Sequence, residues 1–206
     1  MTVVHPPDGV ADAVRAMLEE SGALQTGHFV LSSGLHSDRY CQCAALFEDP
    51  ARAARAAELM AELVRATGPR PDAVLAPAIG GVLWGYELAR ALGCRSIFAE
   101  RPAPNEPLAL RRGFAIRPGE RVLLAEDVVT TGGSVLELPP LLGRAGAEVA
   151  AVCTVVDRSG GRFGARVADR FPAFALLDLH FDVYEPSNLP AWLAERPVEK
   201  PGSRGP

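Results

Sequence analysis

The chain has 206 residues, of which 48% are hydrophobic and 22% are charged, and its formal net charge is −4. This length and composition predict one globular domain, or one domain with a small appendage, with enough apolar residues to build its own core. The acidic balance gives no bulk attraction to nucleic acid. No apolar run approaches the length of a membrane span, and residues 1–9 lack the basic and apolar segments of a secretion signal. We therefore expect a cytoplasmic protein that binds neither nucleic acid nor membranes.

The first part of the chain has two helical patterns with short apolar runs between them. Apolar residues recur at helical spacing from residue 10 until Gly22, a residue type that commonly ends a helix. Asp49 followed by Pro50 is a typical helix start, and Gly68 is a typical end. The expected elements are a helix over 10–21, short apolar segments at 29–31 and 40–43, and a helix over 50–66.

From residue 73 onward, short apolar runs alternate with helical patterns. Such runs are typical of strands buried on both faces of a parallel sheet that helices cover. Ligands bind these sheets beyond the carboxyl ends of the strands, where the Gly-rich segments 77–81, 126–134 and 157–161 are expected. The expected strands are 73–76, 95–99, 122–129, 149–156 and 174–179, with a helix over 82–92 and another after residue 134.

Two proline-rich places interrupt this alternation. Pro139 and Pro140 lie five or six residues into the last of these helices, where proline removes an N–H donor and clashes with the preceding turn. We expect a kink there, or a short first turn and a new helix that starts near Pro139. Residues 99–112 contain three prolines and are expected to form a mobile loop, which leads into an extended segment over 108–116.

The most informative segment runs from Val122 to Ser134. An apolar strand ends in two carboxylates, Glu126 and Asp127, and a loop of hydroxyl and glycine residues follows. Glycines let the backbone bring its N–H groups close to a ligand, and a helix that starts after the loop points its positive end at the same place. This combination predicts a phosphate site. The carboxylates would repel a phosphate, so they are expected to face ribose hydroxyls or a Mg²⁺ ion that the ligand carries.

The chain offers few other reactive groups. Lys200 is the only lysine, and it lies in a Pro/Gly-rich tail, so lysine catalysis is not expected. Cys41 and Cys43 form a C-x-C pair without a second pair, which is a poor zinc framework. We expect buried, reduced thiols at these positions. The motifs GxxxxGK[ST] and GxGxxG of other nucleotide-binding proteins are missing.

The Val122–Ser134 segment closely resembles the phosphoribosyl-diphosphate (PRPP) signature of the type I phosphoribosyltransferases. Residues 27–40, with Leu31, Ser33, Gly34 and Ser37 in an L-x-S-G-x-x-S pattern, resemble the N-terminal segment of the orotate phosphoribosyltransferases. Four motifs appear in order between about residues 22 and 161. The resemblance implies a single α/β domain over 1–206 with the type I phosphoribosyltransferase fold. Its core, about 49–164, would hold a parallel sheet of about five strands flanked by helices, and a small hood would come from about 1–48 and 165–206.

The resemblance also implies a reaction and a set of site residues. The family transfers the 5-phosphoribosyl group of PRPP to N1 of orotate, with Mg²⁺ carried by PRPP, and gives orotidine 5′-monophosphate and pyrophosphate. Glu126, Asp127 and Arg101 would be catalytic. PRPP would contact Glu126, Asp127, Val128, Val129, Thr130, Thr131, Gly132, Gly133, Ser134, Ile79, Gly80, Gly81 and Arg101. Orotate would contact Thr130, Arg158, Tyr40, Cys41, Ser33 and Gly34. No side chain would bind the metal directly.

Some positions depart from the family pattern. Many members have a lysine where this chain has Ser32, and another where it has Gly80. The catalytic loop of the family is rich in basic residues, but only Arg101 matches here, with Arg111 and Arg112 as possible substitutes. Neutralisation of the leaving pyrophosphate would then rest on Arg101, Mg²⁺ and backbone N–H groups. Because the catalytic loop of the family reaches into the neighbouring subunit's site, a homodimer with shared active sites is expected.

Three alternatives remain at this stage. The segment 126–134 also fits an unrelated phosphate loop, since many α/β proteins have a Gly-rich turn between a strand and a helix. Another nucleobase phosphoribosyltransferase would be expected to lack the segment 32–37 and the Asp157-Arg158 pair. A regulatory protein of the same fold that binds RNA would favour a basic face, which the acidic balance does not suggest.

Overall fold

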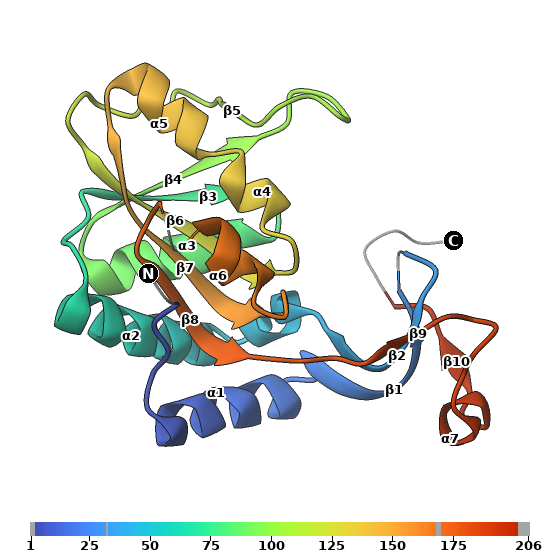
Figure 1. Ribbon diagram of the computed structural model, residues 1–206. Coiled ribbons are helices and arrows are strands. Elements are labelled where there is room, and N and C mark those ends of the chain that lie inside the picture. Colours follow the sequence, from blue (N-terminus) through green and yellow to red (C-terminus); the bar gives the residue numbers. More distant parts are fainter. Residues whose placement is uncertain (1–2, 32, 168–169, 202–206) are drawn as a thin grey trace.

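The computed structural model describes residues 3–31, 33–167 and 170–201 (Figure 1). Its centre is a six-stranded sheet in the order β5-β4-β3-β6-β7-β8, in which β5 alone is antiparallel to its neighbour. The five parallel strands agree with the expected fold class. The strands are β3 (Ala73–Pro77), β4 (Arg95–Glu100), β5 (Ala109–Leu110), β6 (Arg121–Val129), β7 (Glu148–Asp157) and β8 (Ala173–Asp178).

Helices cover both faces of this sheet because its strands are apolar on both sides. On β3, Val74 and Ala76 join one buried cluster, whereas Leu75 joins the other. The first cluster packs the sheet against α1 (Asp8–Glu20), α2 (Pro50–Thr67) and α3 (Gly81–Leu92). The second packs it against α4 (Gly133–Leu136), α5 (Pro139–Ala145) and α6 (Arg162–Val167), so the sheet is the middle layer of three (Figure 1).

Local sequence signals set several helix ends. The Asp49 carboxylate accepts a hydrogen bond from the N–H of Ala51 at 2.8 Å and caps α2, whose first residue is Pro50. Gly93 takes the left-handed conformation after α3, with φ of 73°. The prediction of a new helix near Pro139 is confirmed, because α4 ends at Leu136 and α5 begins at Pro139.

A second sheet forms the hood, in the order β10-β1-β2-β9. Its strands come from residues 24–41 and 183–199, which lie side by side in Figure 1. The short helices η1 (Cys43–Glu48) and α7 (Ala191–Ala194) lie next to them in sequence. The hood strands are β1 (Leu24–Val30), β2 (His36–Cys41), β9 (Val183–Tyr184) and β10 (Val198–Glu199).

Three expectations differ from the structure. The expected hood boundaries do not follow the sheets, because β8 belongs to the core sheet and α1 packs against β8. The expected extended segment 108–116 is wrong beyond β5, since the N–H of Phe114 donates to the carbonyl of Arg111 in a turn. The helix α6 was not expected at all. A contact between distant parts of the chain, that of α1 with β8, decides the first case, whereas local hydrogen bonds form the turn at Phe114 and the start of α6.

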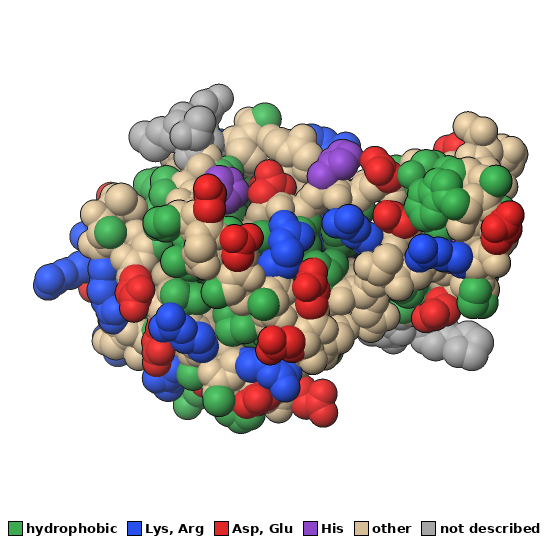
Figure 2. Space-filling view, turned by 90° about the horizontal axis from the view of Figure 1, so that it is seen from below, with side chains coloured by type: hydrophobic (Ala, Val, Ile, Leu, Met, Phe, Trp, Pro, Cys, Tyr) green, Lys and Arg blue, Asp and Glu red, His purple; other side chains and the backbone are tan. Residues whose placement is uncertain are grey.

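The surface is of mixed charge. Figure 2 shows acidic and basic side chains interspersed over one face of the molecule, with hydrophobic side chains between them. Within the described ranges, no helix is both long and apolar enough to cross a bilayer. Because the charges are interspersed, the face drawn in Figure 2 carries no single-sign patch of the kind that binds nucleic acid through its phosphates.

Close packing of α3 on β3 gives a first prediction. A Cβ atom at Gly85 would lie 2.8 Å from the Cβ of Ala76, so the helix has to move away from the strand to accept one. We expect Gly85→Ala to lower the free energy of unfolding by about 1–3 kcal/mol. The matched control is Gly143→Ala on α5, where no atom lies within 4 Å, and where alanine should raise helix stability slightly. Thermal unfolding of both variants is the measurement, and a Gly85→Ala protein as stable as wild type would contradict the packing.

Candidate active site

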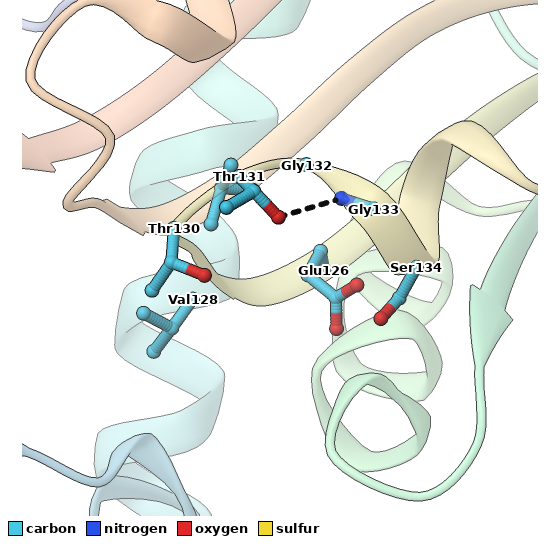
Figure 3. A pocket seen from close by; sticks show the side chains of 8 residues that line it. Glu126, Val128, Thr130, Thr131, Gly132, Gly133 and Ser134 are labelled. Carbon is cyan, nitrogen blue, oxygen red and sulfur yellow. Dashed lines mark hydrogen bonds between the residues drawn. The ribbon is translucent and has the colours of Figure 1, made fainter. Parts of the chain in front are cut away.

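The loops after β3, β6 and β7 meet at the carboxyl ends of these strands. The structure brings the predicted phosphate-loop residues together around one cavity (Figure 3). In Figure 3, the side chains of Glu126 and Ser134 point to the same side of the loop backbone. The cavity is lined by Glu126, Val128, Val129, Thr130, Thr131, Gly132, Gly133 and Ser134.

The conformation of the phosphate loop depends on its glycines and hydroxyls. Gly132 has φ of 73°, a left-handed conformation that side chains disfavour. The hydroxyl of Thr131 accepts a hydrogen bond from the N–H of Gly133 at 3.3 Å, and the N–H of Leu136 donates to the carbonyl of Gly132 at 3.0 Å. These contacts hold the loop in a tight turn that leads directly into α4.

The carboxylates of Glu126 and Asp127 near the end of β6 are half-buried, and both have raised pKa values. Burial, together with the neighbouring Asp127 charge, raises the pKa of Glu126 to about 8. Burial also raises the pKa of Asp127, although its carboxylate accepts a hydrogen bond from the N–H of Val128 at 2.9 Å. Two carboxylates that are partly removed from water favour a ligand that donates hydrogen bonds or brings positive charge.

The segment 77–81 approaches this acid pair closely. A Cβ atom at Gly80 would lie 3.2 Å from Oδ1 of Asp127, and one at Gly81 would lie 3.1 Å from the carbonyl oxygen of Ala125. Glycine at both positions therefore lets the loop lie against β6. Ile79 is 89% exposed at the tip of the loop, and the Ala78–Ile79 peptide bond is cis.

Arg158 lies beside the phosphate loop because β6 and β7 are paired in register. Val129 is opposite Asp157, and the N–H of Arg158 donates to the carbonyl of Val129 at 2.7 Å. The guanidinium stacks over the ring of Phe181, with its carbon 4.2 Å from the ring centroid. Its Nε atom is buried and has no hydrogen-bond partner among the described residues. Burial also lowers the pKa of Arg158. The unpaired Nε leaves this guanidinium with an unmet hydrogen-bond donor that an anion would satisfy.

Tyr40 and Cys41, at the end of β2, lie close to Arg158. A hydrogen bond with Cys43, whose Sγ is 4.0 Å away, lowers the pKa of Cys41, and the Arg158 charge lowers it further. Both of these cysteines are free and buried, as expected. Ser33 and Gly34 lie elsewhere, in the turn between β1 and β2, at the opposite end of β2 from Cys41. Their predicted contact with orotate stays a prediction, and Ser32 lies outside the described residues.

Arg101 lies near the phosphate loop through an ion pair. Its guanidinium is 2.7 Å from Oε1 of Glu137, the residue that follows α4. The possible substitutes are engaged elsewhere, because Arg112 makes a bidentate pair with Glu100 at 3.0 and 2.9 Å, and Arg111 lies 3.9 Å from the same carboxylate. Of these three arginines, Arg101 is the one whose carboxylate partner directly follows α4, the helix after the phosphate loop.

Three contributors were not expected from the sequence. Phe181 supports Arg158, Glu137 pairs with Arg101, and Arg166 on α6 donates a hydrogen bond to the carbonyl of Thr131. No sequence motif connects these residues to the site, since each reaches it from another element. Among the residues that the structure describes, no group of three or more His, Cys, Asp or Glu side chains is arranged to hold a metal ion.

Comparison with known proteins agrees with this geometry. The family model described as phosphoribosyl transferase domain matches residues 42–167. The orotate phosphoribosyltransferase of Thermotoga petrophila is 48% identical over 192 residues, which are 93% of this chain and 98% of that protein. The orotate phosphoribosyltransferase of a Nitratiruptor species is 44% identical over 201 residues, with the same coverage of 93% and 98%.

Solved structures show the same fold. The crystal structure of orotate phosphoribosyltransferase from Aeropyrum pernix has a TM-score of 0.63 at 28% identity, and covers 80% of this chain and 93% of that one. Adenine phosphoribosyltransferase from Leishmania tarentolae has a TM-score of 0.63 at 19% identity, covering 84% and 90%, and this likeness concerns the fold alone. The two orotate phosphoribosyltransferases are 48% and 44% identical to this chain over nearly its whole length, whereas the adenine phosphoribosyltransferase is 19% identical. This difference in identity assigns the chain to the orotate subfamily. This chain belongs to the phosphoribosyltransferases and, within them, to the orotate phosphoribosyltransferase family.

Proposed function

We propose that the reaction of this family, transfer of the 5-phosphoribosyl group from PRPP to N1 of orotate, takes place where the ends of β6 and β7 meet. One observation carries the proposal. The register of the two strands sets Arg158, a half-buried residue whose Nε has no hydrogen-bond partner among the described residues, directly beside the start of the phosphate loop. A site for an anionic flat base and a site for a phosphorylated ribose are then adjacent, as joining the two requires.

The proposed roles follow the chemistry of each group. Glu126 and Asp127 accept hydrogen bonds from the ribose hydroxyls, and backbone N–H groups and hydroxyls of residues 130–134 bind the 5′-phosphate. Arg158 binds the orotate carboxylate, for which a planar guanidinium is well matched. Tyr40, Cys41 and Thr130 contact the base, and loop 77–81 binds the pyrophosphate.

The reaction asks the protein to stabilise separated charges. As the bond between ribose C1 and pyrophosphate breaks, positive charge develops on the ribose and negative charge on the leaving group, while orotate N1 forms the new bond. In this proposal the acid pair would face the ribose, and Arg101 with loop 77–81 would face the leaving group, so that each would stabilise the charge that develops beside it. The carboxylates of Glu126 and Asp127 would face the Mg²⁺ that PRPP carries without binding it directly. Mg²⁺ bound with PRPP would supply positive charge beside the leaving pyrophosphate.

We also propose a homodimer in the cytoplasm. Ile79, Leu83 and Tyr86 are 89, 55 and 61% exposed, and they form an apolar face on the tip of loop 77–81 and on α3. An exposed apolar face next to a site is typical of a protein–protein interface, and a second copy of the chain is the partner that the family resemblance suggests. Free thiols support a reducing compartment.

Base specificity provides a test of the site. Wild-type protein with PRPP and Mg²⁺ should release pyrophosphate with orotate but not with uracil, adenine or hypoxanthine, because uracil lacks the carboxylate and the purines do not fit a pyrimidine site. We expect Arg158→Ala to raise the KM for orotate at least tenfold, by the loss of about 2–4 kcal/mol of charged hydrogen bonding, and to change the KM for PRPP little. Equal effects on both substrates would contradict the assignment of Arg158.

The raised pKa of Glu126 makes stability depend on pH. An ordinary glutamate titrates at 4.5, whereas Glu126 in the folded protein titrates at about 8. Between these values the folded state binds more protons than the unfolded state, so this group lowers the free energy of unfolding as pH rises through the window. We expect the Tm of Glu126→Gln relative to wild type to rise from pH 5 to pH 8.5, while PRPP binding is lost.

The control for this measurement is Glu137→Gln. The Arg101 guanidinium lowers the pKa of Glu137, so this carboxylate stabilises the fold when ionised and loses that contribution as pH falls through its folded pKa. Its substitution should therefore leave the Tm unchanged at low pH and lower it slightly at neutral pH. A pH-independent difference between Glu126→Gln and wild type would show that Glu126 titrates normally.

The shared site is tested by complementation. We expect Arg101→Ala and Asp127→Asn each to be nearly inactive as pure dimers. If Arg101 serves the neighbouring subunit's site, random reassortment of the two variants gives half mixed dimers with one intact site each, and roughly a quarter of all sites work. The measurement is orotate-dependent pyrophosphate release after mild dissociation and mixing at equal amounts. No recovery, with subunit exchange confirmed by labelled chains, would place Arg101 in its own subunit's site, beside its partner Glu137.

A further inference from the structure

Arg166 connects α6 to the phosphate loop. Its guanidinium donates a hydrogen bond to the backbone carbonyl of Thr131, which is 35 residues earlier in the chain. Thr131 and the next residue, Gly132, both line the cavity in Figure 3. The contact is therefore made to the peptide unit that forms the wall of the proposed 5′-phosphate site.

The position of α6 is fixed independently of Arg166. The carboxylate of Asp157 accepts a hydrogen bond from the N–H of Ser159 at 2.7 Å, and the hydroxyl of Ser159 accepts one from the N–H of Phe163 at 2.8 Å. Phe163 is fully buried, and its ring lies 3.4 Å from the place of a Cβ atom at Gly132. The end of β7 and the loop itself thus hold the helix in place.

A carbonyl and the following N–H point in opposite directions in a trans peptide. Because Arg166 holds the carbonyl of Thr131, the N–H of Gly132 points away from the guanidinium. The opposite orientation would turn a carbonyl oxygen, with its partial negative charge, toward a bound anion. A flexible glycine follows Thr131 in a left-handed conformation, so this peptide has little side-chain restraint of its own.

We propose that Arg166 is a positioning residue for the 5′-phosphate of PRPP. It fixes the Thr131–Gly132 peptide so that the N–H of Gly132 is directed at the phosphate, and its positive charge lies behind the same peptide. This inference rests on the proposed function of the loop as the 5′-phosphate site. It gives Arg166, a residue outside the loop motif, a part in positioning the groups that bind the ribose phosphate. Glu126, Asp127 and Glu137 near the loop are all acidic, so a positive charge behind the loop would favour a bound anion.

The test separates the two ends of PRPP. Ribose 5-phosphate carries the 5′-phosphate and pyrophosphate does not, so calorimetric binding of each is measured for wild type and for Arg166→Ala. We expect Arg166→Ala to weaken ribose 5-phosphate about tenfold and to leave pyrophosphate unchanged. In steady-state kinetics the KM for PRPP should rise by about the same factor, with kcat and the KM for orotate within about twofold of wild type.

Matched variants distinguish positioning from a general loss of structure. Arg162→Ala removes an exposed arginine one turn earlier on α6 and should bind both ligands as wild type does. Arg166→Lys keeps a charged donor and should restore part of the affinity for ribose 5-phosphate, whereas Arg166→Gln, without the charge, should restore less. If Arg166→Ala does not fold, the affinities of the Lys and Gln variants for ribose 5-phosphate decide the matter: tighter binding by Arg166→Lys than by Arg166→Gln supports the proposal, and equal binding contradicts it.

Three results would overturn the inference. The first is unchanged binding of ribose 5-phosphate by Arg166→Ala. The second is a loss of pyrophosphate binding by Arg166→Ala as large as its loss of ribose 5-phosphate binding. The third is a loss of ribose 5-phosphate binding by the Arg162→Ala control as large as that of Arg166→Ala. Failure of the wild-type protein itself to bind ribose 5-phosphate would instead contradict the assignment of the loop, and with it the role of Arg166.

Discussion

A pair of carboxylates held partly out of water at the end of β6 is the constraint on which the rest of the site depends. Burial and the neighbouring Asp127 charge raise the pKa of Glu126 to about 8, and burial raises the pKa of Asp127 above its ordinary value. Such a pair costs stability in the free protein, and it fits the proposed binding of ribose hydroxyls. The close approach of Gly80 to Asp127 follows from the same constraint, because a side chain there would press on the carboxylate.

Positive charge in this protein is supplied almost entirely by arginine. Arg158, Arg101 and Arg166 approach the site from three different directions, through β7, the loop after β4 and α6. Each has a distinct partner, namely the ring of Phe181, the carboxylate of Glu137 and the carbonyl of Thr131. A guanidinium offers five donors in a fixed plane, so one such group can be held by the protein and still serve a ligand.

Parallel pairing of β6 with β7 brings together residues that are far apart in the sequence. The register of Val129 with Asp157 sets Arg158 beside Thr130. The buried ring of Phe163 packs α6 against the phosphate loop at Gly132. The hood adds Tyr40 and Cys41 from the start of the chain and Phe181 from its end. The proposed orotate site would thus draw on three segments, whereas the phosphate loop is continuous.

The sequence by itself determined the parallel sheet, the phosphate loop, the acid pair and the restart of the helix at Pro139. These features depend on local patterns: apolar runs, adjacent carboxylates, glycines and a missing N–H donor. Only the tertiary structure decided the partners of Arg101 and Arg158, the place of Ser33 and Gly34 at the far end of β2, and the contact of Arg166 with Thr131. Those contacts join elements far apart in the chain, and no local pattern encodes them because strand register and helix packing fix them.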